Sequence, residues 1–120
     1  MATERKSMHG LTIRWSLDGA APDVLTRLRG YVHDSSHASF TGMDGLRFKT
    51  WRAREDEWFE GCYVFASPAE RDRFQQEFTE SAVTSQVSQI IGSAPVLVEP
   101  CEVIAVAEGA AGFTPVAALD

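Results

Sequence analysis

Hydrophobic and polar residues alternate along three stretches of the chain, which predicts three β-strands. In residues 11–17, Leu, Ile, Trp and Leu occupy every second position, a pattern typical of a half-buried strand. The same pattern recurs in residues 46–53 and, after the four charged residues 54–57, in residues 58–66. Because four consecutive charges are costly to bury, we expect the chain to reverse in water there and form an antiparallel hairpin.

Two stretches have helical spacing instead. Pro22 precedes apolar residues spaced three and four apart as far as Val32, which predicts a first helix. Residues 67–70, Ser-Pro-Ala-Glu, form a capping box that begins a second helix, with Phe74 and Phe78 one turn apart on its apolar face.

The remaining segments predict connections and a last strand. Residues 33–44 are small, polar and contain glycine, so we expect a long loop. The second helix is expected to kink or restart near Ser81, where its apolar stripe changes phase, and to end at Gly92. Residues 96–106 are typical of a strand in which Pro100 indicates a bulge or a sheet edge.

This order of elements predicts an α+β fold, the ferredoxin-like βαββαβ arrangement with an antiparallel sheet of strand order 4-1-3-2. Aromatic residues on the sheet face without helices would need cover, so we expect a homodimer packed sheet against sheet, a dimeric α+β barrel whose two copies together enclose a chamber. The expected divisions are a flexible N-terminus at 1–8, the domain at 9–107 and an Ala/Gly-rich tail at 108–120. The tail would be disordered or dock through Phe113.

Composition and charge bear on which partners the protein can bind and on its cellular compartment. The 120 residues carry a net charge of −6 without a basic run, which argues against a nucleic-acid partner. No apolar run approaches the ~20 residues of a spanning helix, and the N-terminus does not resemble a signal peptide, so we expect a cytoplasmic protein without a membrane partner. Cys62 and Cys101 lack metal-site spacing and are expected to be buried free thiols two strands apart.

The central stretch resembles a known family. GLRFKTW, EGCYVF and the SPAE cap are similar to the YdhR-like monooxygenase family of small dimeric α+β barrel proteins. The matching positions are Gly45, Lys49, Trp51, Gly61, Tyr63 and Phe65. The resemblance implies a monooxygenase without a cofactor, whose substrates are molecular oxygen and an electron-rich aromatic or polyketide-like small molecule.

The turn between the hairpin strands decides whether the matching side chains meet. Lys49 and Trp51 share one face of their strand, and Tyr63 and Phe65 share one face of the next. An odd number of turn residues would bring all four into one cavity, and an even number would separate them. We expect them to coincide, because the resemblance keeps both sets together.

Such a cavity would suit a phenol or an anthrone-like substrate, whereas the absence of a cavity of roughly 300 Å³ would favour a dimer without catalysis. Its expected stacking walls are Trp15, Trp51 and Phe65. Lys49 would stabilise the substrate anion and Tyr63 would relay its proton, with Arg47 or Arg14 as substitutes. The structural alternative places Lys49 and Arg47 in solvent and Tyr63 in the core.

Two histidines are further candidates. His33 and His37 are four residues apart, so on a helix they would share a face, as metal ligands often do. With no third ligand nearby we expect no metal, and we keep the pair as candidate general bases at the mouth of the cavity. Glu60 would be a rim carboxylate or face solvent.

Three functions therefore stay open from the sequence: an oxygenase without metal or flavin, a non-redox cyclase or isomerase in the same pocket, and a ligand-binding or structural dimer without catalysis.

Overall fold

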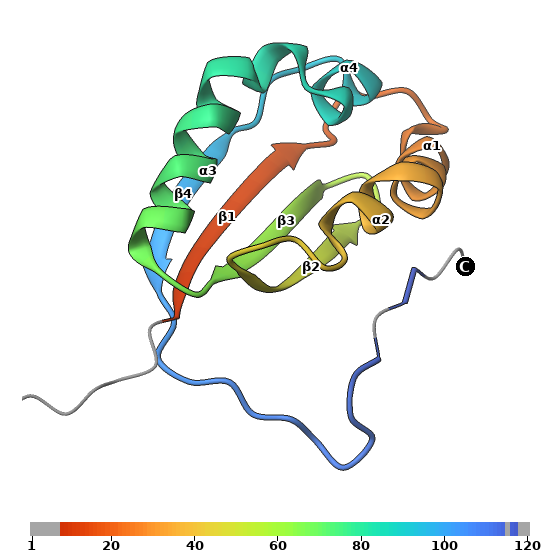
Figure 1. Ribbon diagram of the computed structural model, residues 1–120. Helices are drawn as coiled ribbons and strands as arrows, with labels where there is room; N and C mark the ends of the chain where they lie inside the picture. Colours follow the sequence, from red (N-terminus) through yellow and green to blue (C-terminus); the bar gives the residue numbers. More distant parts are fainter. Residues whose placement is uncertain (1–7, 115, 118–120) are drawn as a thin grey trace, which may run out of the picture.

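The computed structural model describes residues 8–114, 116 and 117. Helices cover one face of a four-stranded antiparallel sheet (Figure 1). The strands are β1 (His9–Ser16), β2 (Leu46–Arg54), β3 (Trp58–Phe65) and β4 (Leu97–Glu102). Their order across the sheet, β2-β3-β1-β4, is the predicted one, and the α+β ferredoxin-like fold is confirmed.

The first helical segment is longer than predicted. It comprises α1 (Val24–Tyr31), the π-helical turn η1 (Val32–Ser36) and α2 (His37–Phe40). The expected loop at 33–44 is therefore wrong as far as Phe40. Ser36 is buried, and the Phe40 ring packs against Tyr63 and Phe74, so tertiary contacts outweigh the weak helix propensity of the Ser and His residues.

The second helical segment breaks where the phase of its apolar stripe changes. It consists of α3 (Pro68–Ser81), the 3₁₀ turn η2 (Ala82–Thr84) and α4 (Gln86–Ile91). The Ser67 hydroxyl accepts a hydrogen bond from the Glu70 amide at 3.2 Å, which confirms Ser67 as the cap, but the Glu70 carboxylate accepts from Arg73 at 2.6 Å and does not complete the capping box. Gly92 ends α4 in the left-handed region, with φ of 91°.

The apolar face of the sheet is the one under the helices. Leu11, Ile13, Trp15, Tyr63 and Phe65 form its buried core. The expectation of a surplus aromatic face without helices is wrong, because the helices cover these rings. Of the aromatic residues in the strands, only Phe48 and Trp58 lie on the open face, as their register shows.

The fourth strand is shorter than predicted, because β1 begins at His9, which pairs with Glu102. Past Glu102 the amide of Val103 still donates a hydrogen bond to the Met8 carbonyl, at 3.2 Å. Pro100 lies on the edge strand β4, as expected. The following segment leaves the end of the sheet in a wide loop and then reverses direction (Figure 1). The centre of the Phe113 ring lies 6.2 Å from that of Phe48.

Cys62 and Cys101 are free thiols on β3 and β4, with β1 between them. Cys62 is half-buried and Cys101 is exposed, so their expected burial is wrong. Of the helices in the described part of the chain, none combines the length and apolar character that a bilayer crossing requires.

Candidate functional site

A cavity of about 170 Å³ lies between the helices and the sheet. Aromatic side chains form most of its wall: Trp15, Tyr31, Phe40, Trp51, Phe59, Tyr63, Phe74 and Phe78. Lys49, Ser36, Ser85 and Gln86 supply its polar side chains, with Gly61 and Val87 completing the lining. The described lining contains one cationic side chain and no carboxylate.

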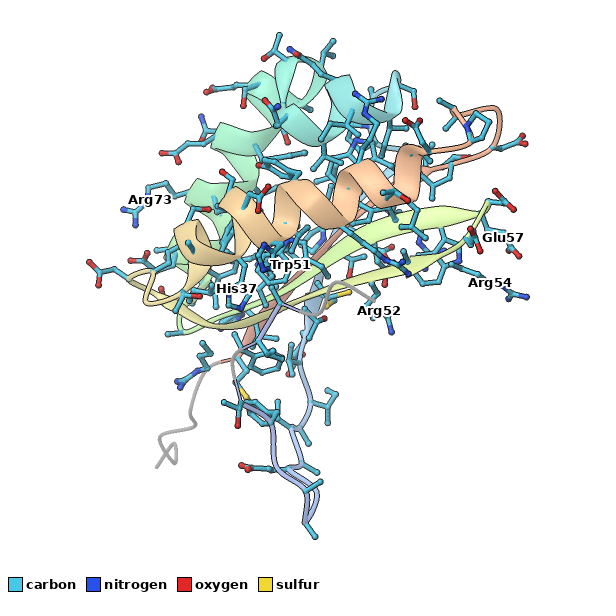
Figure 2. All side chains as sticks on the ribbon, turned by 90° about the vertical axis from the view of Figure 1, so that its right-hand side faces the viewer. His37, Trp51, Arg52, Arg54, Glu57 and Arg73 are labelled. Atoms are coloured by element: carbon cyan, nitrogen blue, oxygen red, sulfur yellow. The ribbon has the colours of Figure 1, made fainter. Side chains whose placement is uncertain are left out.

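The hairpin brings the polar groups together through its turn. Three residues, 55–57, join Arg54 to its partner Trp58, so the turn is odd in length, as we expected. Lys49 then pairs with Tyr63, and both face the helices. Figure 2 shows Trp51 between the sheet and the helix above it.

A β-bulge at the start of β2 sets the position of Arg47. Leu46 pairs with Phe65 and Phe48 with Val64, which leaves Arg47 as the extra residue. Arg47 is exposed and does not line the cavity. Phe65 also lies outside it, 2% exposed, with its ring centre 6.0 Å from that of Tyr63 in a stacked arrangement.

The amino group of Lys49 sits among aromatic rings. Its Nζ atom lies 3.5 Å from the centre of the Phe40 ring and 4.4 Å from those of Trp51 and Tyr63. No carboxylate of a described residue lines the cavity beside it, and Lys49 forms no hydrogen bond with a described residue, so the three N–H donors of its ammonium form would be unmet there.

Burial therefore lowers the pKa of Lys49 well below its ordinary value, with a small opposing effect from Cys62. Cation–π attraction to the rings, up to about 2 kcal/mol at a desolvated site, favours the ammonium. Desolvation of an ion costs several kcal/mol, and each unmet donor adds about 1–3 kcal/mol, so the neutral amine is favoured.

Tyr63 supplies a hydroxyl that stays protonated, because burial raises the pKa of the phenol. It converges with Lys49 above Gly61. A methyl group on Gly61 would lie 3.1 Å from the Tyr63 oxygen and 3.2 Å from Lys49 Cε. The absence of a side chain at Gly61 thus leaves room for both groups, and Lys49 Nζ lies 4.4 Å from the centre of the Tyr63 ring.

Hydrogen bonds fix the two tryptophan walls. Trp51 Nε1 donates to the Ser36 hydroxyl at 3.2 Å, and Trp15 Nε1 donates to the Ser88 hydroxyl at 2.9 Å. Both indoles line the cavity, at the places where stacking walls were expected.

The two histidines lie outside the cavity lining. His33 is exposed and its Nδ1 is 3.0 Å from the Asp34 carboxylate. The centre of the His37 ring lies 5.7 Å from that of Trp51, but His37 does not reach the cavity. No group of three potential metal ligands occurs among the described residues.

Glu60 is on the open face and is fully buried there, so its expected place at a rim or in solvent is wrong. Arg14 donates to one carboxylate oxygen at 2.8 Å, and Arg52 and Cys62 donate to the other. Burial opposes the charge, but these hydrogen bonds outweigh it and lower the pKa of Glu60. Because Arg14 lies here, it cannot replace Lys49 in the cavity.

Sequence reasoning missed the walls contributed by the helices, of which Ser36 and Phe40 are the clearest. Both fall in the segment expected to be a loop. Ser36 and Phe40 follow Val32 at intervals of four residues, which on a helix places all three on one face. This spacing could have predicted that the helix continues to Phe40.

Comparisons with known proteins add to the fold. No family model matches the chain, and no curated protein matches its sequence. Among solved structures, a Nitrosomonas europaea protein of unknown function is 18% identical, with a TM-score of 0.63 over 89% of this chain and 99% of that one. A Chloroflexus aurantiacus protein proposed to be an antibiotic biosynthesis monooxygenase is 14% identical, with a TM-score of 0.44 over 84% and 97% of the two chains. At these identities the first likeness bears on the fold alone, and we draw nothing from the second.

Proposed function

We propose that this protein is a monooxygenase without metal or flavin that oxidises a small phenol with molecular oxygen. The observation that supports it most is the Lys49 amine, held in an aromatic cavity without a carboxylate and close to a protonated tyrosine. A neutral amine can take the proton of a bound phenol, and the resulting ammonium stabilises the phenolate. His33 and His37 stay outside this proposal, since neither lines the cavity.

The cavity volume limits the substrate. At about 170 Å³ it is smaller than roughly 300 Å³, yet a cavity of about 150 Å³ in another protein binds benzene. A one-ring phenol therefore fits between Trp15, Trp51 and Phe40. An anthrone or a larger polyketide would require the helices to move away from the sheet.

The reaction balances without an external reductant. Lys49 removes the phenol proton, and the electron-rich phenolate passes an electron to oxygen, after which the two radicals combine in a C–O bond. Loss of water from the ring hydroperoxide leaves a quinone, so one oxygen atom enters the product and the other leaves as water. In this scheme the ammonium of Lys49 returns its proton to the peroxide, Tyr63 donates a proton to the departing hydroxide, and the proton lost from the ring carbon restores Tyr63.

Oxygen consumption with a panel of one-ring phenols and hydroquinones, in buffer treated with a chelator, tests the proposal. We expect one molecule of oxygen consumed and no hydrogen peroxide released per quinone formed, and a loss of about 10²–10⁴-fold in Lys49→Met. Lys6→Met, at the other lysine of the sequence, is the matched control and should keep full activity. Binding of phenols without any oxygen uptake would refute the oxygenase.

A non-redox isomerase is the second candidate, because a neutral amine beside a protonated hydroxyl is also an acid–base pair for moving a proton within a substrate. Turnover under strict anaerobiosis would select it. Ligand binding with no turnover in either atmosphere would favour the non-catalytic alternative.

We also propose that two copies pair through the open sheet face. Phe48 and Trp58 remain there, with the Arg14 guanidinium 4.3 Å over the centre of the Trp58 ring. Beside it, the C-terminal segment exposes Ile104 and Phe113, which are 82% and 64% exposed in one copy. Light scattering should give twice the 13.2 kDa mass of one chain, and a monomer at micromolar concentration would exclude this pairing.

A further inference from the structure

We propose that Lys49 also captures small aromatic aldehydes and ketones covalently, as an imine. This activity uses the cavity of the proposed oxygenase but not its oxygen chemistry. Imine formation needs an uncharged amine, a pocket that holds the carbonyl compound against it, and a proton donor for the carbonyl oxygen.

The geometry supplies the three requirements. The Lys49 amine lines the cavity, and no carboxylate of a described residue there holds it as an ammonium. Ring faces from Phe40 and Trp51 stand next to it and would stack on an aromatic carbonyl compound. The Tyr63 hydroxyl converges with the lysine above Gly61 and forms no hydrogen bond with a described residue.

The chemical step is complete with these groups. The amine nitrogen attacks the carbonyl carbon and forms a C–N bond, while the carbonyl oxygen takes a proton from Tyr63 and becomes the hydroxyl of a carbinolamine. The nitrogen then gives up its proton, Tyr63 is reprotonated, and the carbinolamine loses its hydroxyl as water. The product is a C=N bond at Lys49, with no change in oxidation state.

The sequence makes this step easy to follow, because Lys6 is the only other lysine. In Lys6→Arg protein, benzaldehyde and sodium cyanoborohydride would convert each imine to a stable benzylamine, which peptide mass mapping assigns to Lys49 or to the N-terminal amine. The reaction is run at neutral pH without oxygen.

We expect Lys49 in the folded protein to be benzylated at least about tenfold faster than Lys49 in urea-unfolded protein, since each unit of pKa lowering gives about ten times more neutral amine. Tyr63→Phe should slow the folded-state reaction, and Lys49→Met, with its circular dichroism spectrum unchanged, should gain no internal adduct. Equal rates in folded and unfolded protein, or adducts confined to the N-terminal amine, would overturn the proposal.

The two proposals fail separately. Benzylation of Lys49 without oxygen uptake by any phenol would keep imine capture and remove the oxygenase. Oxygen uptake with a phenol, without benzylation of Lys49, would keep the oxygenase and remove imine capture.

Discussion

Replacement of Lys49 by methionine should change how stability depends on pH. The pKa of Lys49 is lower in the folded chain than in the unfolded chain. Between these two values the unfolded chain binds a proton that the folded chain lacks, so the free energy of unfolding rises with pH. The stability contribution is complete above the unfolded pKa, near 10.4, and is lost as the pH falls toward the folded pKa.

The size of the effect follows from linkage. Within that window one proton per molecule gives about 1.4 kcal/mol of stability per pH unit, and a methionine side chain cannot contribute it. Methionine also changes packing, but that difference is independent of pH. The wild-type free energy of unfolding minus that of Lys49→Met should therefore increase by about 1.4 kcal/mol for each pH unit.

Urea unfolding at several pH values from neutral to about 10, followed by tryptophan fluorescence, measures this difference. Lys6→Met provides the control and should track the wild type. If wild type and Lys49→Met differ by a constant amount over the whole range, the amine is an ordinary exposed ammonium. The reasoning about the cavity would then be wrong.

Three further substitutions test other parts of the structure. Gly61→Ala should reduce phenol turnover at least about tenfold, because the added methyl group would displace Lys49 and Tyr63. Steady-state oxygen uptake measures this loss. Unchanged kinetics would contradict the close approach of these two side chains to Gly61. Glu60→Gln should lower the free energy of unfolding by about 1–3 kcal/mol at neutral pH. The difference from wild type should disappear in acid, because the wild-type carboxylate protonates as the pH falls through its lowered pKa. Urea unfolding at two pH values measures this difference, and an equal loss of stability at both would refute the ionic role. Ser67→Ala should lower stability by about 1 kcal/mol through loss of the cap on α3, seen in the same assay, whereas Ser67→Asp should restore most of it.

Local rules explain why much of the fold could be predicted. The charged turn at 54–57 and the helix cap at Ser67 depend on neighbouring residues alone, and both elements form where the sequence places them. The shared face of Lys49 and Tyr63 was expected from the family resemblance and not from the turn, because the run of four charged residues at 54–57 does not show that three residues, 55–57, form the turn.

The errors involve contacts between distant parts of the chain. Phe40 is helical because Tyr63 and Phe74 provide a surface for its ring, and nothing within residues 33–44 indicates that surface. Glu60 is buried because Arg14 comes from the other neighbouring strand. The inward-facing aromatic residues indicated a cavity, but only the three-dimensional arrangement shows that one chain encloses it.

The central claim is that burial in the cavity lowers the pKa of Lys49 well below its ordinary value, and an NMR titration tests it most directly. With lysine labelled with ¹³C at Cε, the chain gives two side-chain signals, from Lys6 and Lys49. The account predicts that the Lys49 signal, assigned by its absence in Lys49→Met, titrates with a pKa well below the ordinary value near 10.4. Titration of both signals together near 10.4 would contradict it.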